Sequence, residues 1–236
     1  MTYAKYKGIS CLDRLKSIQL IRCADGEYHQ PHKVFFPSQL LDSIFVRGYP
    51  VPHADYDIPK EENRQRESSW FSLFSRLGVK CEPSPKDLLE AIWRIIQTPP
   101  TEESIEQLRP IYEYLNENWR GKLYRQAVEF SSLKSWKWLP AENDNSQYYA
   151  PNELYPVRLR SVAKTRGRFL RFSREPDANF RAFLGMPADA KTEDIVGYLL
   201  DLSKTPPADG ERPNYHEIYR VLNARLKSPE EERIIN

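Results

Sequence analysis

The sequence contains two diverged copies of one segment, and this repeat constrains the fold more than any other feature. Leu77-Gly78 recurs 107 residues later as Leu184-Gly185, and Thr98-Pro99-Pro100 recurs at the same distance as Thr205-Pro206-Pro207. In this register ten of the forty positions from 77 to 116 are identical, against about two or three expected by chance from ordinary residue frequencies. Such self-similarity indicates one supersecondary unit repeated in tandem.

The match continues upstream with a larger spacing. Leu15-Lys16-Ser17 matches Leu133-Lys134-Ser135, 118 residues later, and Tyr28 matches Tyr148, 120 residues later. Because the spacing falls from 120 to 107, copy 1 carries thirteen extra residues. We expect them in a surface loop at about residues 48–66, mainly Pro50 to Pro59.

These spacings predict a first repeat unit over residues 1–122 and a second over residues 123–236. The sequence stops thirteen residues after Asn223, whereas seventeen residues separate the equivalent Asn116 from Leu133, where the second hairpin begins. We therefore expect an excerpt of a longer, multi-domain protein that carries further repeats.

Each copy is expected to open with a β-hairpin. In copy 1, Ile18 to Arg22 and Tyr28 to Phe36 have the pattern of two strands around the turn Ala24-Asp25-Gly26. Their counterparts in copy 2 are Trp136 to Leu139 and Gln147 to Tyr155. Two small antiparallel sheets are predicted.

Helices are expected to follow each hairpin. Gly78 and Gly185 end apolar helical segments, where a glycine in the left-handed conformation forms a C-cap. Ser84-Pro85-Lys86-Asp87 supplies an N-cap hydroxyl, a first-turn proline and an early acid for the next helix. The last helix carries an apolar stripe with helical spacing at Leu108, Ile111, Tyr112 and Leu115. The predicted fold is α+β, mainly α, with two tandem repeats, each a short β-hairpin followed by two or three helices.

Composition narrows the class of protein. The chain has 236 residues, a hydrophobic fraction of 40% and a mean hydropathy of −0.69, which are typical of a globular protein. It has no apolar run long enough for a membrane span and no signal-like start, so we expect a cytoplasmic location and no membrane partner. Three cysteines without CxxC spacing indicate neither a disulfide framework nor a zinc ribbon.

The recurring residues resemble the repeats of sacsin and its prokaryotic relatives. The resemblance rests on Leu-Gly-Val, on a Pro-x-Asp-Leu-Leu helix start and on Ile-Tyr-x-x-Leu-Asn, together with a Tyr or Trp before x-x-Pro. The residues that carry it are Leu15, Ser17, Tyr28, Pro31, Leu77, Gly78, Val79, Pro85, Asp87, Leu88, Leu89, Ile111, Tyr112, Leu115 and Asn116, with their copy 2 partners.

In that family such repeats follow a GHKL-type ATPase domain, so the resemblance implies a large ATP-driven, chaperone-like or defence-related parent protein. This chain shows neither the Asn-bearing helix with Asp-x-Gly and a glycine lid nor a GxxxxGK[ST] loop. No ATP-binding residue is carried over, and no cofactor is expected in this chain.

One segment is strongly basic. From Val157 to Arg174 the sequence has seven cations, no acid, and two interleaved phenylalanines. Cations beside aromatic rings can neutralise phosphates and stack on bases, so the segment is a candidate nucleic-acid or anion site. The alternative is an exposed segment whose arginines are solvated or pair with acids elsewhere. The candidate residues are Arg158, Arg160, Lys164, Arg166, Arg168, Arg171 and Arg174.

The loop expected in copy 1 only is a second candidate, because loops inserted in repeats often carry contacts with a partner protein. Its candidate residues are Tyr49, His53 and Tyr56. Cys23, His29 and His32 could ligate zinc, but a fourth ligand is missing, and no metal is predicted. No catalytic residue is assigned, since the paired acids at helix starts are explained by the helix dipole.

The sequence favours a non-enzymatic repeat module of a large GHKL-ATPase-type protein, in a chaperone-like or scaffold role. Its expected partners are another protein or other domains of the same polypeptide. The alternative is a nucleic-acid-contacting module of a prokaryotic anti-phage or restriction-like defence protein, in which the arginine segment makes the contact.

Overall fold

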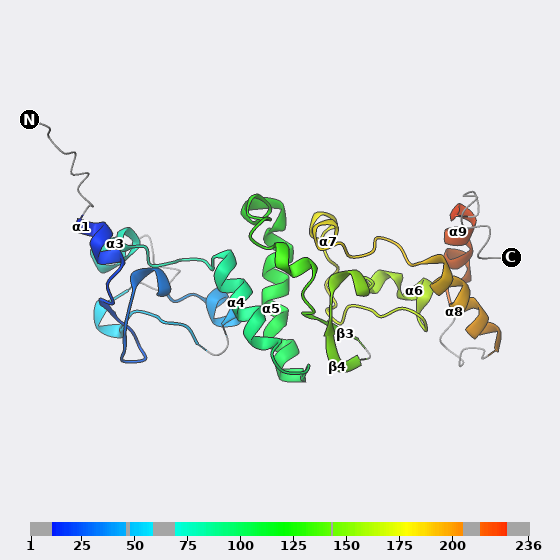
Figure 1. Ribbon diagram of the computed structural model, residues 1–236, viewed down its shortest axis with the longest axis horizontal. Helices are drawn as coiled ribbons and strands as arrows, with labels where there is room; N and C mark the ends of the chain where they lie inside the picture. The colour runs from blue at the N-terminus through cyan, green and yellow to red at the C-terminus, as the bar shows by residue number, and fades with distance from the viewer. Residues whose placement is uncertain (1–10, 46–47, 59–68, 143, 205–212, 226–236) are drawn as a thin grey trace, which may run out of the picture. The chain divides into compact units, whose positions relative to one another are not determined.

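The computed structural model describes residues 11–45, 48–58, 69–142, 144–204 and 213–225 (Figure 1). The chain divides into two compact units, Met1–Leu88 and Leu89–Asn236. The fold is α+β and mainly α, as predicted, with two small antiparallel sheets. Most of the helical half of copy 1 therefore belongs to the same compact unit as copy 2.

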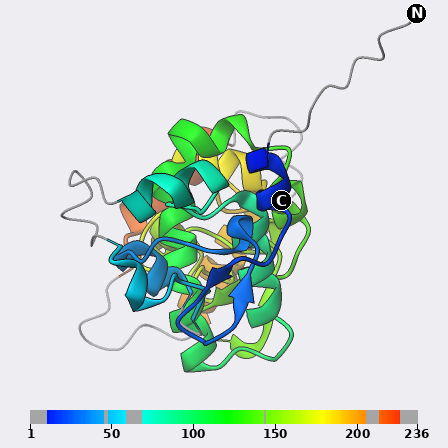
Figure 2. The ribbon, with the colours of Figure 1, turned by 90° about the vertical axis from the view of Figure 1, so that its left-hand side faces the viewer.

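The first compact unit is built around the hairpin that pairs Ile21 with His29 (Figure 2). Its buried core includes Ile21, Val34, Phe36 and Phe74. Its elements are α1 (Cys11–Lys16), β1 (Ile21–Arg22), β2 (Tyr28–His29), the 3-10 turn η1 (Pro31–Lys33), α2 (Gln39–Ile44), the 3-10 turn η2 (Ala54–Tyr56), α3 (Ser69–Leu77) and the start of α4 (Pro85–Ile95).

The second compact unit begins with the rest of α4 and contains the hairpin that pairs Leu139 with Tyr149. Its further elements are α5 (Glu102–Asn118), the π-helical turn η4 (Trp119–Leu123), the 3-10 turn η5 (Ser131–Lys134), β3 (Leu139–Ala141), β4 (Asp144–Tyr149), the 3-10 turns η6 (Pro151–Glu153) and η7 (Val157–Leu159), α6 (Arg160–Ala163), α7 (Ala178–Leu184), α8 (Thr192–Lys204) and α9 (Tyr215–Arg225).

The predicted hairpins are present, but their second strands are shorter than expected. β2 ends at His29 and β4 at Tyr149, whereas the predicted strands continued to Phe36 and Tyr155. In both copies a proline follows two residues after the strand and begins a 3-10 turn, η1 or η6. Proline has no backbone donor for a strand pair and its φ suits the first position of a turn.

The glycine caps are confirmed in both copies. Gly78 and Gly185 follow α3 and α7 with φ of +96° and +71°, the left-handed region in which a side chain is disfavoured. The next amide then donates back to the helix, from Val79 to the Phe74 carbonyl at 3.0 Å and from Met186 to the Arg181 carbonyl at 3.1 Å. These four residues stand in the 107-residue register, so the repeat seen in the sequence is also a repeat of hydrogen bonds.

Helix α5 is the longest helix among the described residues, and two side chains hold its first turn. The Thr101 hydroxyl accepts from the Ser104 amide at 3.1 Å, and the Ser104 hydroxyl accepts from the Thr101 amide at 2.8 Å, which together form a capping box. Its apolar stripe is buried, with Leu108, Ile111 and Leu115 all 0% exposed.

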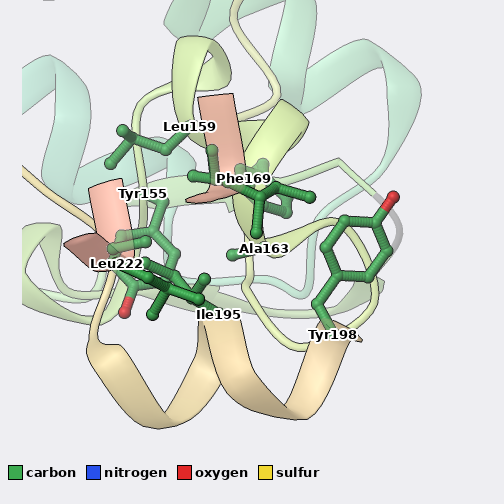
Figure 3. Close-up of a cluster of buried hydrophobic side chains, with 10 residues drawn as sticks. Tyr155, Leu159, Ala163, Phe169, Ile195, Tyr198 and Leu222 are labelled. Atoms are coloured by element: carbon green, nitrogen blue, oxygen red, sulfur yellow. The ribbon is translucent and has the colours of Figure 1, made fainter. Parts of the chain in front are cut away.

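The core of copy 2 joins the segment after the hairpin to the last two helices (Figure 3). Tyr155 and Phe169 pack there with Ile195 of α8 and with Ile218 and Leu222 of α9. α6 contacts both α8 and α9, so three helices close over this cluster (Figure 1). Among the described residues, no helix is long and apolar enough to cross a membrane.

Candidate functional site

Residues 168–171 of the arginine segment pair with the copy 2 hairpin and with Tyr155 through isolated bridges, while the first half of the segment forms η7 and α6. The Glu142 amide donates to the Phe169 carbonyl at 2.9 Å, and the Arg171 amide donates to the Pro140 carbonyl at 3.0 Å. On its other side the Tyr155 amide donates to the Arg168 carbonyl at 2.8 Å. Phe169 and Leu170 are both buried between these bonds, whereas Arg168 before them is exposed. Hydrogen bonds thus fix the backbone of residues 168–171, with Arg168 exposed and Arg171 partly buried.

Acids of the same compact unit form ion pairs with Arg160, Arg166, Arg171 and Arg174. Arg166 donates through two nitrogens to Asp201 of α8, with Nε 2.7 Å from Oδ2. Arg171 donates twice to Glu102, the first residue of α5, at 2.6 and 2.7 Å. The other two pairs are Arg160 with Glu142 and Arg174 with Glu117. This arrangement matches the alternative in which the arginines pair with acids elsewhere.

The other three candidate residues, Arg158, Lys164 and Arg168, differ in their neighbours. The Arg158 side chain donates to the Ala188 carbonyl at 2.5 Å. The guanidinium carbon of Arg168 lies 5.0 Å from the centre of the Tyr149 ring, a cation–π contact at the surface. Lys164 is exposed. The structure therefore brings the seven cations onto one segment but directs them to different neighbours.

A pocket of about 420 Å³ opens beside this segment. The Tyr155 hydroxyl lies at its wall, where it donates to Asp194 Oδ2 at 2.6 Å and accepts from the Lys191 amide at 3.0 Å. Burial, followed by the hydrogen bond to Asp194, raises the pKa of Tyr155 to about 12. Tyr155 is thus a neutral donor at physiological pH rather than a base. The lining residues are Asn152, Glu153, Tyr155, Arg166, Gly167, Arg168, Pro187, Lys191 and Asp194.

The candidate loop of copy 1 is held against its own unit. The Tyr49 hydroxyl donates to Asp42 Oδ1 at 2.8 Å, and the Tyr56 ring lies 5.0 Å from the rings of both Trp70 and Phe74. His53 is hydrogen-bonded through Nδ1 to the Asp55 amide at 3.3 Å. These side chains are used within the first compact unit.

Backbone hydrogen bonds show that this loop of copy 1 and the arginine segment of copy 2 occupy equivalent positions. In copy 1 the Ala24 amide donates to the Val51 carbonyl and the His53 amide donates to the Arg22 carbonyl, at 2.9 and 3.0 Å. Adding 118 to each of these four numbers gives the Glu142–Phe169 and Arg171–Pro140 bonds described above. The two candidate segments are therefore the same structural element in the two copies.

This equivalence limits which residues of copy 1 can be the insertion. Pro50 to His53 belong to the repeat, because they pair with the hairpin as residues 168–171 do. From His53 to Leu77 copy 1 has 24 residues, against 13 from Arg171 to Leu184, so eleven of the extra residues follow His53. The other two precede Pro50. The predicted range of 48–66 therefore includes residues 50–53, which belong to the repeat, and its residues 59–66 lie outside the part of the chain described.

Sequence reasoning missed the residues that join copy 1 to copy 2 within the second compact unit. The Tyr112 hydroxyl donates to the Arg174 carbonyl at 3.0 Å. Asn116 donates to the Glu175 carbonyl at 3.0 Å and accepts from the Asp177 amide at 2.6 Å. The Tyr112 ring also lies 4.8 Å from the Phe172 ring. We call Tyr112 and Asn116 the α5 clamp, because they hold the backbone at the end of the arginine segment and just after it.

The signal for the α5 clamp was present but ambiguous. Tyr112 and Asn116 belong to the Ile-Tyr-x-x-Leu-Asn pattern that recurs in copy 2 as Tyr219 and Asn223. Asn116 is 6% exposed, and a buried asparagine requires a hydrogen-bonding partner. The identity of that partner depends on the packing of segments 59 to 62 residues apart.

The considered zinc ligands do not converge. His29 Nε2 lies 2.8 Å from Asp25 Oδ2, while the Cys23 thiol is buried and donates to the Ile21 carbonyl at 3.7 Å. Burial, and then the nearby Asp25 carboxylate, raises the pKa of the Cys23 thiol to about 12. A thiol with such a pKa is a poor metal ligand and a poor nucleophile at neutral pH. Within the described residues, no group of three or more potential ligands could hold a metal ion.

Comparisons of this chain with protein-family models, with curated proteins and with solved structures found no match.

Proposed function

We propose that this chain is a non-catalytic, sacsin-like repeat module of a large GHKL-ATPase-type protein. In this proposal the module serves protein–protein interaction or allosteric coupling, and each copy of the repeat is joined to the next by its last helix. The observation that carries the proposal is the α5 clamp, in which Tyr112 and Asn116 of copy 1 bind the backbone of copy 2.

The chemistry of the α5 clamp supports a mechanical role. Its three hydrogen bonds go to two carbonyls and one amide of the backbone, so they fix the path of the chain rather than recognise a ligand. Tyr112 and Asn116 are also nearly inaccessible, at 0% and 6% exposed. Buried polar groups of this kind specify a single arrangement, because an unpaired amide in the same place is costly. A displacement of α5 would therefore be passed directly to residues 174–177.

The test is to loosen the α5 clamp and follow amide hydrogen exchange in residues 172–177. We expect Asn116→Ala to speed exchange of the Asp177 amide by roughly tenfold, as for the loss of one or two buried hydrogen bonds. Asn118→Ala is the matched control, because the Asn118 side-chain amide donates to the Tyr114 carbonyl within α5. Equal exchange in the two variants would contradict the coupling role.

The nucleic-acid alternative has a separate test. The triple variant Arg166→Glu, Arg168→Glu and Arg171→Glu reverses the charge on the arginine segment. Because Arg166 and Arg171 are engaged by acids, we expect the unmodified chain to bind single-stranded DNA and RNA only weakly at low salt. Saturable, salt-dependent binding that the triple variant abolishes would favour the nucleic-acid alternative instead.

A further inference from the structure

The last helices of the two copies are equivalent in sequence but differ in what covers them. On α5, Leu108 and Tyr112 are both 0% exposed. Their counterparts on α9, Tyr215 and Tyr219, are 43% and 60% exposed. The difference is confined to one face, because Ile218 is 0% exposed, like its counterpart on α5. Helix α9 thus packs on its own copy and leaves its other face without a neighbour among the described residues.

The uncovered residues of α9 correspond to the α5 clamp. Tyr219 and Asn223 stand 107 residues after Tyr112 and Asn116, and both are exposed. They share the spacing of one helical turn that places the Tyr112 hydroxyl and the Asn116 amide along one extended backbone. We call Tyr215, Tyr219 and Asn223 the α9 face.

Side chains around the hairpin also differ in exposure between the two copies, and here the exposed ones are in copy 1. In copy 2, Tyr148 is 4% exposed and its hydroxyl donates to Ser104 of α5 at 2.8 Å. Its counterpart in copy 1, Tyr28, is 55% exposed. Phe180, whose ring lies 6.1 Å from the Tyr112 ring, is 0% exposed, whereas its counterpart Leu73 is 37% exposed. The positions that receive α5 in copy 2 therefore lie open in copy 1.

A third pair of positions agrees. Leu133 of copy 2 is 0% exposed, and Leu15, its counterpart on α1, is 36% exposed. Trp70 on α3, three residues before Leu73, is 43% exposed. Helices α1 and α3 contact each other, and exposed aromatic and leucine side chains are typical of a surface that binds another protein. We call Leu15, Tyr28, Trp70 and Leu73 the hairpin face.

We propose that the α9 face of one molecule binds the hairpin face of a second copy of this chain. The contact would reproduce between molecules the junction that α5 makes with copy 2 inside the second compact unit. This inference rests on the proposed function and names the partner as a further unit of the same repeat. The two faces carry different residues, so the contact is head-to-tail and each molecule retains one unused face.

Such an interface has a diagnostic behaviour. A head-to-tail contact that does not close into a ring adds molecules without limit, so the mean mass should rise continuously with concentration. A two-fold contact would instead stop at a dimer.

The experiment is sedimentation velocity of the whole chain over a wide range of concentrations, with two blocking variants. Tyr219→Glu places a charge on the α9 face, and Leu73→Glu places one on the hairpin face. Both positions are exposed helical surface, so folding should be retained and is checked by circular dichroism. Tyr124→Glu is the matched control, because Tyr124 is 61% exposed and lies outside both faces.

We expect the unmodified chain and the control to grow with concentration, and each blocking variant alone to remain monomeric. An equimolar mixture of the two blocking variants should form a heterodimer and nothing larger, because one intact face of each kind remains. An unmodified chain that stays monomeric, or a mixture that fails to pair, overturns the inference. The proposed function is judged separately, by the exchange of the Asp177 amide in Asn116→Ala.

Discussion

Helices α4 and α8 begin at equivalent positions in the two copies, yet different side chains hold their first turns. In copy 1, Asp87 accepts from Lys80 Nζ at 2.7 Å and from the Ser84 amide at 2.8 Å, and Lys80 also lies 4.9 Å from the centre of the Phe35 ring. In copy 2 the equivalent acid, Asp194, accepts from the Tyr155 hydroxyl at 2.6 Å.

Tyr155 occupies the position of Phe35, 120 residues later. A tyrosine hydroxyl thus replaces the ammonium group of Lys80 as the donor to the acid. In both copies the acid at the helix start accepts a hydrogen bond, but the donor is Lys80, just before α4, in copy 1 and Tyr155, after the hairpin, in copy 2. Aligned identities therefore underestimate how similar the two copies are.

The largest effect is expected when the acid at the helix start is removed from each copy in turn. We expect Asp87→Ala to lower the free energy of unfolding by about 2 kcal/mol, because it leaves Lys80 and the Ser84 amide without their partner. Asp194→Ala should cost about 1 kcal/mol, since it removes one bond from a neutral hydroxyl. Urea unfolding measures both losses, and exchange of the Leu88 and Ile195 amides, which make the equivalent bonds at 3.1 Å, localises them. Equal losses in the two copies would refute the difference between the donors.

The two arrangements should also fail at opposite ends of the pH scale. Burial tends to raise the pKa of Asp87, but hydrogen bonds from Lys80 and Ser84 outweigh it and hold the pKa below the ordinary value of 3.8. A lowered pKa gives stability that is present above that value and is lost as the pH falls through the folded-state pKa. Tyr155 has the reverse sign: its pKa rises from 10.0 to about 12, so its contribution is present below pH 10 and is lost between these values.

Amide exchange near each helix start, followed from acid to alkaline pH, should therefore show copy 1 loosening in acid and copy 2 in alkali. Asp87→Asn should remove the acid-dependent part, and Tyr155→Phe should remove the alkaline part. A common pH profile for the two copies would count against this assignment.

Local patterns were sufficient to predict the elements of the fold but not their partners. The C-caps at Gly78 and Gly185 follow from the conformational freedom of glycine, which acts within one turn. The hairpins were recognised, although the prediction ran through Pro31 and Pro151, where the prolines end the strands.

The candidate sites could be predicted only in part, for a physical reason. The arginine segment and the copy 1 loop share no identical residue at the aligned positions 51–53 and 169–171, so only their backbone bonds reveal that they are equivalent. Likewise, the acids that engage Arg166 and Arg171 lie 35 and 69 residues away in the sequence. Pairing at such distances is decided by tertiary packing, which the charge pattern of one segment does not encode.

A double substitution sharpens the comparison of the helix starts. Tyr155→Phe installs the copy 1 ring in copy 2 and should cost about 1 kcal/mol, because Asp194 and the Lys191 amide each lose a partner. Pro187 stands 107 residues after Lys80 and lines the same pocket as Tyr155 and Asp194. Adding Pro187→Lys to Tyr155→Phe should therefore restore much of the loss, whereas Pro187→Met supplies a similar length without the charge. Urea unfolding measures the free energy of unfolding of each variant. Equal values for Pro187→Lys and Pro187→Met, each combined with Tyr155→Phe, would show that the ammonium group does not replace the hydroxyl.

The smallest expected effect concerns the Arg166–Asp201 ion pair, which copy 1 lacks because Gly48 stands 118 residues before Arg166. The pair is exposed, but it joins a segment to a helix 35 residues away, and the close approach of Arg166 to α8 is possible because Gly197 has no side chain. Arg166→Gln should lower the midpoint of thermal unfolding slightly at low salt and have little effect at high salt, where exposed charges are screened. Arg220→Gln is the control, because Arg220 pairs with Glu217 within one turn of α9. An ion pair between distant segments restricts more of the chain than a pair within one helix, so Arg166→Gln should lower the unfolding midpoint more than Arg220→Gln does. An equal or smaller shift for Arg166→Gln would show that α8 does not stabilise the arginine segment.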